Sequence, residues 1–207
     1  VTLYVSECRN MGIEILPPHV NESYQDFHVV DEKIIFGLAA VKNVGEGAIN
    51  SILEARQEAG PFCSLSDFAR RVDLRKVNKK GVESLVKCGA FDGMGPSRRA
   101  MIEALDVVLE QAANSQREKR EGQFNLFAGE CVPGEEANVF ESRIPDLAEW
   151  DDSTKLNHEK QAMGFYLTGH PLVNYEDLIR RYVNAFADKL GALAESSTVK
   201  MAGLVKK

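Results

Sequence analysis

The sequence predicts a mainly α-helical protein with a small β element near its N-terminus and a lone strand at its C-terminal end. Between residues 37 and 113, apolar residues recur at steps of three and four, which is the period of amphipathic helices. Short apolar runs typical of strands stand before residue 37 and after residue 197. Glycines and prolines separate these stretches, so we expect short helices joined by tight turns.

Composition and charge exclude several classes of protein. The chain has 207 residues, of which 44% are hydrophobic and 27% charged, as in globular rather than disordered proteins. No apolar run approaches the roughly 18 residues of a membrane-spanning helix, and the N-terminus lacks the pattern of a secretory signal. Because the first residue is not Met, we expect a piece of a longer protein. The formal net charge of −6, taken alone, argues against binding nucleic acid.

The first 36 residues predict one helix followed by a small β element. Residues 1–11 can begin as a helix, and Gly12 is placed to end it. Three short apolar runs predict strands, at residues 13–16, 27–30 and 34–36. Asp31, Glu32 and Lys33 stand between the last two runs and predict the turn of a β-hairpin.

Capping residues mark the starts of the later helices. They are Ser64, Asn78, Ser97 and Ser153, which precede expected helices at 65–68, 79–88, 98–113 and 154–163. Gly60 and Pro61 interrupt the chain before the first of these helices, and Gly89 stands just past the second, where glycine commonly ends a helix. Residues 175–182 offer another helical stretch, and the alternation of residues 198–205 predicts the terminal strand.

A glycine-containing turn, Val41–Ala48, joins two helical stretches and resembles the helix-hairpin-helix element. In such a turn the backbone N–H groups that open the second helix are free, and glycine lets a phosphate approach them. Asn43 replaces the first glycine of the usual pattern, and Asn tolerates the left-handed conformation. The candidate phosphate-binding residues are Lys42, Asn43, Val44, Gly45 and Gly47. The alternative is a plain turn between helices, and Glu46 at its mouth is unfavourable for phosphate.

A second unit of this kind follows, with a longer glycine hairpin at residues 89–95 inside a basic window. Residues 68–100 carry a net charge of +6 and the rest of the chain −12, and local charge governs the field at a surface. Two arginines open the helix after this hairpin, where an anion such as phosphate would offset their conflict with the helix dipole. The candidates for a sequence-independent grip on duplex DNA are Lys76, Lys79, Lys80, Arg98 and Arg99. The alternative is a solvated helix face.

None of the four cysteines or four histidines predicts a metal or catalytic site. The cysteines form no CxxC pair, and no histidine follows them at ligand spacing. Such sparse cysteine usage suits reduced thiols in a cytoplasm. We therefore expect structural roles for these eight residues.

Residues 114–147 change in composition and predict a flexible linker with one apolar island. The island consists of Gln123, Phe124, Asn125, Leu126 and Phe127. A glutamine that makes hydrogen bonds and two hydrophobic side chains that fill apolar space suit a peptide that docks in a surface pocket. The pattern Gln-x-x-Leu-Phe resembles the bacterial sliding-clamp-binding motif. The alternative is that Leu126 and Phe127 pack back on their own domain.

Taken together, these stretches resemble the α subunit of bacterial DNA polymerase III, a C-family replicative polymerase. The segments that carry the resemblance are Glu7–Ile13, Pro17–Ser23, Phe36–Lys42, Gly60–Phe62, Val77–Lys80, Lys87–Asp92 and Glu159–Leu172. The resemblance implies the end of a fingers domain (1–36), a tandem helix-hairpin-helix region (37–113), a flexible linker with the clamp-binding peptide (114–147), a helical segment (148–196) and the first strand of an OB-fold (197–207).

The resemblance also implies what the longer protein does. The parent would be a DNA-directed DNA polymerase with Mg²⁺ in an upstream palm domain, whereas this chain carries no cofactor and no catalytic carboxylate. Implied partners are primer–template duplex DNA, the sliding clamp (β subunit) and other holoenzyme subunits, in the bacterial cytoplasm at the nucleoid and without a membrane. Two alternatives remain: a non-catalytic repair or scaffold protein with the same modules, and a mutagenic paralogue of the polymerase.

Overall fold

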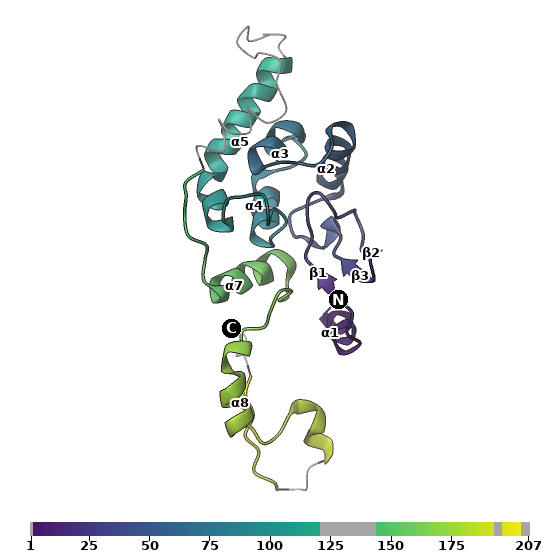
Figure 1. Ribbon diagram of the computed structural model, residues 1–207, viewed down its shortest axis with the longest axis vertical. Helices are drawn as coiled ribbons and strands as arrows, with labels where there is room; N and C mark the ends of the chain where they lie inside the picture. The colour runs from purple at the N-terminus through teal and green to yellow at the C-terminus, as the bar shows by residue number, and fades with distance from the viewer. Residues whose placement is uncertain (1, 121–143, 193–195, 204–207) are drawn as a thin grey trace. The chain divides into compact units, whose positions relative to one another are not determined.

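The computed structural model describes residues 2–120, 144–192 and 196–203, and the chain divides into two compact units, 1–168 and 169–207 (Figure 1). In the first unit the helices are α1 (Thr2–Asn10), the 3₁₀ helix η1 (Leu38–Ala40), α2 (Glu46–Ala59), α3 (Leu65–Arg71), α4 (Lys79–Lys87), α5 (Arg98–Arg120) and α7 (Asp152–Met163). The mainly helical fold class with a small β element is therefore confirmed.

The β element is a three-stranded sheet with strand order β1-β3-β2. Its strands are β1 (Ile15–Leu16), β2 (His28–Val30) and β3 (Lys33–Ile35). β2 and β3 pair antiparallel around a two-residue turn in which Asp31 and Glu32 both have positive φ, 47° and 62°, the conformation that matches the twist of a hairpin. The expected hairpin is thus confirmed. The parallel pairing of β1 with β3 has no signal in the local sequence, because it joins Ile15 to Ile34 and Leu16 to Ile35, far apart along the chain.

Most helix ends follow the expected capping residues. Ser64 accepts a hydrogen bond from the amide of Asp67, and Asn78 accepts one from the amide of Gly81. The expected cap of α7 at Ser153 was wrong. Asp151 caps this helix instead, because its carboxylate accepts hydrogen bonds from both the amide and the hydroxyl of Thr154.

The α5 helix runs to Arg120, beyond the expected end at residue 113, so residues 114–120 do not belong to a linker. Its last turns are polar, yet they contact α3. The side-chain amide of Gln116 donates to the carbonyl oxygens of Ala69 and Val72, at 3.0 and 2.7 Å, at the C-terminal end of α3. The last carbonyls of a helix have no partner within it, so Gln116 supplies donors to the C-terminal end of α3 and joins the last turns of α5 to that helix.

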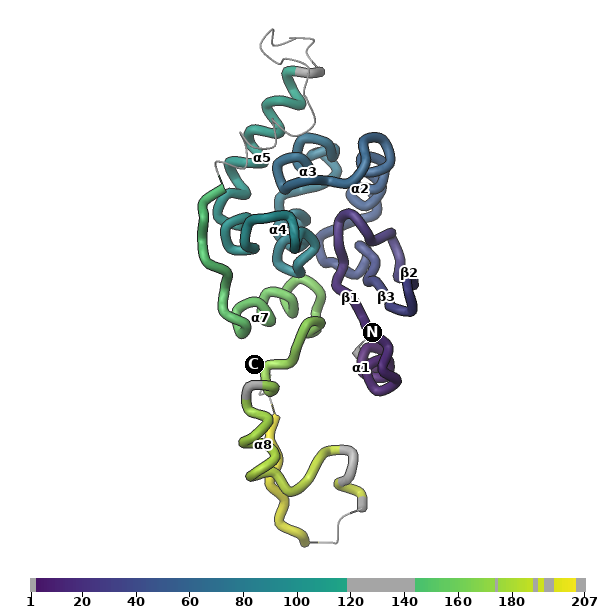
Figure 2. The backbone as a smooth tube through the Cα atoms, in the orientation of Figure 1, coloured from purple at the N-terminus to yellow at the C-terminus, as the bar shows by residue number. Residues whose placement is uncertain are grey.

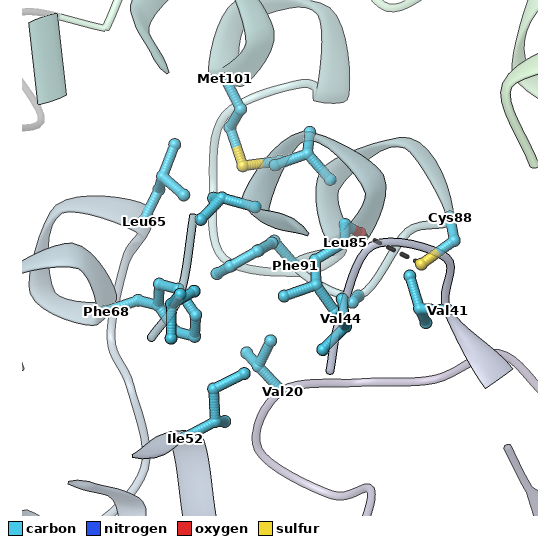
Figure 3. Close-up of a cluster of buried hydrophobic side chains, with 14 of the residues drawn as sticks. Val20, Val41, Val44, Ile52, Leu65, Phe68, Leu85, Cys88, Phe91 and Met101 are labelled. Atoms are coloured by element: carbon cyan, nitrogen blue, oxygen red, sulfur yellow. Dashed lines mark hydrogen bonds between the residues drawn. The ribbon is translucent and has the colours of Figure 1, made fainter. Parts of the chain in front are cut away.

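The hydrophobic core of the first unit is built from buried residues of its helices and of the turns between them. α4 packs against both α5 and α7, and α3 packs against α5 (Figure 2). The rings of Phe68 and Phe91 meet edge to face with centroids 5.0 Å apart. Val41 and Val44 enter the same cluster beside Leu85 (Figure 3). The turn that carries these two valines is therefore attached to the core rather than suspended in solvent.

The second unit contains η2 (Val173–Tyr175), α8 (Glu176–Tyr182) and η3 (Ala187–Ala192). Residues 198–203 have no regular secondary structure, so the described part of the expected terminal strand is not formed. Their backbone is held by Asn184, whose side chain accepts from the amide of Lys200 at 2.7 Å and donates to the carbonyl of Thr198 at 3.2 Å. A strand needs a hydrogen-bonded neighbour along its length, and one asparagine supplies only a local substitute.

Candidate nucleic-acid interface

The first glycine hairpin connects η1 to α2 and is anchored at two points. Val41 and Val44 are buried in the core, which turns the intervening Lys42 and Asn43 outward to solvent. Asn43 has φ of +65°, the left-handed conformation expected where the usual pattern has glycine. Its side chain donates to the hydroxyl of Ser84 on α4 at 3.1 Å. Among the predicted phosphate-binding residues, Val44 could contribute only its backbone, because its side chain is part of the core.

The N-terminus of α2 has no side-chain cap from the part of the chain that the structure describes. Gly45 occupies the N-cap position with extended backbone, φ −84° and ψ 168°, and it cannot supply a capping oxygen. The first hydrogen bonds back to its carbonyl come from the amides of Ala48 and Ile49, at 2.9 and 3.0 Å. The amides of Glu46 and Gly47 therefore precede the first intrahelical bond and lie on an exposed turn at the positive end of the helix.

The fold does not require glycine at positions 45 and 47. Neither residue is among those with positive φ. A Cβ atom added to Gly45 or Gly47 would meet no atom within 4 Å, so there is room for a side chain at both positions. The absent side chains leave the adjacent amides open to a group approaching from solvent, which is the use of glycine at phosphate sites.

Two other elements converge on this hairpin. A Cβ added to Gly81 would lie 2.9 Å from the carbonyl oxygen of Asn43, so the start of α4, with the exposed Lys80, lies directly against the turn. The amide of Lys42 donates to the carbonyl of Ala162 at 2.8 Å, at the end of α7. We define the hairpin surface as Lys42, Gly45, Glu46, Gly47 and Lys80. It combines open amides with exposed lysines, and Glu46 is its one acidic member.

The second hairpin differs because its arginine is used internally. Arg98 is only 6% exposed, and its guanidinium contacts both carboxylate oxygens of Asp92, at 2.8 and 2.6 Å. It also lies 3.4 Å from a carboxylate oxygen of Glu159 on α7. A Cβ on Gly89, whose φ is +86°, would clash with the guanidinium. The absence of a side chain at Gly89 therefore leaves space for the buried Arg98 guanidinium. We assign Arg98 a structural role rather than a phosphate contact.

The N-terminus of α5 already holds an anion supplied by the protein. The carboxylate of Glu149 accepts from the amides of Arg98 and Arg99, at 2.9 and 3.4 Å. Partial burial disfavours its charged form, yet hydrogen bonds from the amides of Arg98, Trp150 and Arg99 lower its pKa overall. The conflict between two arginines and the helix dipole is thus relieved by Glu149. Sequence reasoning missed this residue because it lies 51 positions after Arg98.

The remaining predicted cations are exposed, but they are not equivalent. Lys76 precedes α4, Arg99 lies in the first turn of α5, and both side chains face solvent. Lys79 forms an ion pair with Asp106 of α5. The basic window therefore divides into side chains open to solvent and side chains engaged within the protein.

Comparisons with known proteins agree with this geometry. A family described as a helix-hairpin-helix motif matches residues 12–101. The chain is 37% identical to DNA polymerase III subunit alpha of Vibrio cholerae over 97% of its length, and 43% identical to that of Thermus aquaticus over 86%. The chain matches one segment of DNA polymerase III α subunits. The Escherichia coli K12 subunit is also 37% identical over 97% of the chain, so the expected resemblance is confirmed.

The chain spans only 14–17% of the length of these DNA polymerase III α subunits. The helix-hairpin-helix match ends at Met101, in the first turn of α5, so α7 lies outside it. The predicted clamp-binding peptide, residues 123–127, lies outside the described residues. Within the described residues, no group of three or more His, Cys, Asp or Glu side chains is arranged to hold a metal ion. Among the helices that the structure describes, none combines the length and the apolar character of a membrane-spanning segment.

Proposed function

We propose that this chain binds the backbone of duplex DNA without reading its sequence, through the hairpin surface. The observation that carries the proposal is the uncapped N-terminus of α2, where two glycines leave the amides of Glu46 and Gly47 open. Amides at a helix N-terminus bind a phosphate without contacting bases. The family match to a helix-hairpin-helix motif and the DNA polymerase III names of the relatives support this proposal.

Exposed lysine and arginine side chains should make the affinity for duplex DNA depend on salt. Four of the predicted cations are exposed and form no ion pair with another described residue: Lys42, Lys76, Lys80 and Arg99. Each phosphate that a lysine neutralises releases counterions, and it adds about 0.9 to the slope of log affinity against log salt on B-form DNA. Arg98, Lys79 and Lys87 are paired with carboxylates, so they contribute less than the total charge of the window suggests.

For the parent protein we propose DNA polymerisation, with Mg²⁺ bound outside this chain and with a tether to the sliding clamp through residues 123–127. The names of the relatives support the polymerase, and the Gln-x-x-Leu-Phe pattern supports the tether. Duplex binding and clamp binding on one chain would raise each other's effective concentration, so two weak contacts could keep the polymerase on its template.

Fluorescence anisotropy with a labelled duplex, titrated with the 207-residue chain at increasing salt, tests the DNA proposal. We expect binding at low salt that weakens steeply as salt rises. Lys42→Ala and Lys80→Ala should each weaken binding and reduce the salt slope by about 0.9. Lys155→Ala changes the net charge equally, but it removes a lysine near the start of α7 and serves as the control. Absence of binding at low salt, or binding insensitive to salt, would refute the proposal.

The clamp proposal is tested separately by replacing Leu126 and Phe127 with Ala and measuring affinity for purified sliding clamp. We expect the affinity to fall, because these two side chains would fill the apolar pocket. Duplex binding of the same variant should be unchanged, since the peptide is not part of the hairpin surface. An unchanged clamp affinity would show that another segment is the anchor.

A further inference from the structure

One buried carboxylate in α7 has partners in several segments of the first unit. Glu159 is only 1% exposed, and an isolated charge at that depth would be very costly. Its oxygens accept from the hydroxyl and amide of Thr168, at 2.8 and 3.1 Å, and from the amide of Leu167 at 3.3 Å. The guanidinium of Arg98 adds a fourth contact at 3.4 Å. All of these partners donate, which suits a carboxylate because it accepts hydrogen bonds and donates none.

These contacts fix how the chain leaves α7. The helix ends at Met163, and Gly164 has a left-handed conformation with φ of +89°, which reverses the chain direction. Leu167 and Thr168 then return to the last turns of the same helix, where Glu159 holds their amides. We call this arrangement the α7 clasp, defined as Glu159, Leu167, Thr168 and Arg98.

The end of α7 that the clasp holds is also the part that contacts the first hairpin. The carbonyl of Ala162 accepts from the amide of Lys42, and a Cβ atom added to Gly164 would lie 3.9 Å from the Lys42 ammonium nitrogen. The C-terminal end of a helix carries partial negative charge, which favours an ammonium group beside it. The direction of the Lys42 backbone and the location of its side chain therefore depend on where α7 ends.

The opposite side of the clasp reaches the second hairpin. Arg98 joins Glu159 to Asp92, in the loop after α4, and Arg98 itself opens α5. Burial works against the charge on Arg98, but its contacts with Asp92 and Glu159 more than compensate and raise its pKa. We call the second hairpin closed, because Arg98 and the first amides of α5 are bound by carboxylates of the protein, and the first hairpin open, because the amides of Glu46 and Gly47 face solvent. Glu159 thus links the closed second hairpin to α7, against which the open first hairpin lies.

We propose that Glu159 is a positioning residue for the hairpin surface, acting through the end of α7 on Lys42. This inference rests on the proposed DNA binding and extends the binding module beyond residues 12–101, to which the helix-hairpin-helix match is confined. Glu159 does not touch DNA. It keeps the Ala162 carbonyl and Gly164 where they orient Lys42 toward a phosphate held by α2.

A double-mutant cycle on duplex binding tests this role, using Glu159→Gln, Lys42→Ala and the double variant. A Gln side chain must direct one NH₂ group at donors that the carboxylate accepted from, so it opens the clasp with little change in volume. We expect Glu159→Gln to weaken binding about 2- to 30-fold, the range seen for residues that act through a network. Lys42→Ala should then cost clearly less in the Glu159→Gln background than in the wild type, because the lysine is already misplaced.

A control variant, an exchange measurement and a second variant of the clasp separate positioning from general stability. Asp152→Asn, in the exposed first turn of α7, is the matched control and should leave binding unchanged. Hydrogen exchange of the Lys42 amide, which needs no DNA, should accelerate in Glu159→Gln and stay slow in Asp152→Asn. Thr168→Val, which removes only the hydroxyl contact, repeats both assays if the Glu159→Gln variant does not fold.

The outcomes are distinct for the two proposals. Wild-type protein that fails to bind duplex DNA refutes the proposed function, whereas the exchange result still reports on the clasp. Wild-type binding with additive effects of Glu159→Gln and Lys42→Ala refutes the positioning role. Unchanged exchange at Lys42 in a folded clasp variant also refutes it.

Discussion

Gly47 offers a test in which stability and binding are expected to change in opposite directions. Gly47→Ala adds a Cβ to the first turn of α2, where it meets no atom within 4 Å and no left-handed backbone has to be kept. Such substitutions stabilise proteins by about 0.4–1 kcal/mol, because alanine reduces the freedom of the unfolded chain. For a protein of this size, each kcal/mol corresponds to about 2–4 °C in Tm. Urea denaturation and thermal melting should therefore show a slightly more stable protein.

Duplex binding by the same variant should fall, because the new methyl group stands between the amides and an approaching phosphate. Loss of one hydrogen bond to a charged group costs about 1.5–3 kcal/mol. Since about 1.4 kcal/mol is a factor of ten in affinity, we expect anisotropy titrations to show about 10- to 100-fold weaker binding.

Asn50→Ala is the matched control for this prediction, because Asn50 is exposed on the same helix and Ala is the better helix former. It should raise stability without changing affinity. Equal affinity of wild type and Gly47→Ala would show that no backbone group approaches this turn. A fall in stability would show that the open space beside Gly47 does not exist in solution.

Three further substitutions test the closed second hairpin. Arg98→Ala should lower the free energy of unfolding by about 3–5 kcal/mol in urea titrations, because it leaves the buried Glu159 without its cation. A decrease below about 1 kcal/mol, the size typical of an exposed ion pair, would contradict this. Gly89→Ala should also destabilise the protein, by about 1–2 kcal/mol from the strain of a left-handed alanine. The steric clash of the new methyl group with the Arg98 guanidinium should add to this loss. Glu149 has a lowered pKa in the folded protein, so its contribution is present above its unfolded pKa and is lost as pH falls through the folded value. Glu149→Gln should therefore narrow the difference between urea midpoints measured at neutral pH and at a pH below the folded pKa, and an unchanged difference would show that this carboxylate is not held by the α5 amides.

Many of the helix boundaries could be predicted from the sequence because their causes are local. Asn78 and Ser64 act on amides three residues away, and Gly89 and Gly12 adopt positive φ just after helices. The hairpin around Asp31 likewise depends on adjacent residues. Prediction was wrong where a distant residue takes part in the boundary or where two nearby residues can both serve as the cap. Gln116, past the expected end of α5, contacts the end of α3, and Asp151 rather than Ser153 caps α7.

One part of the candidate site could likewise be predicted from local sequence, and another part could not. Asn43 in a left-handed conformation and Gly45 before a helix are visible as a pattern, so the first hairpin could be located from the sequence. The internal role of Arg98 could not be predicted from the sequence. A positive charge at a helix start is compatible with a bound phosphate or with an internal carboxylate, and the sequence does not say which one is nearer.

The sequence by itself determined that this chain is mainly helical, that it contains two glycine hairpins, and that its positive charge gathers around the second. Only the tertiary structure decided that the first hairpin is open and the second closed. The physical reason is that an open helix terminus and a satisfied one differ by a carboxylate brought from elsewhere. Glu149 and Glu159 lie 51 and 61 residues from Arg98, and packing alone brings them to the second hairpin.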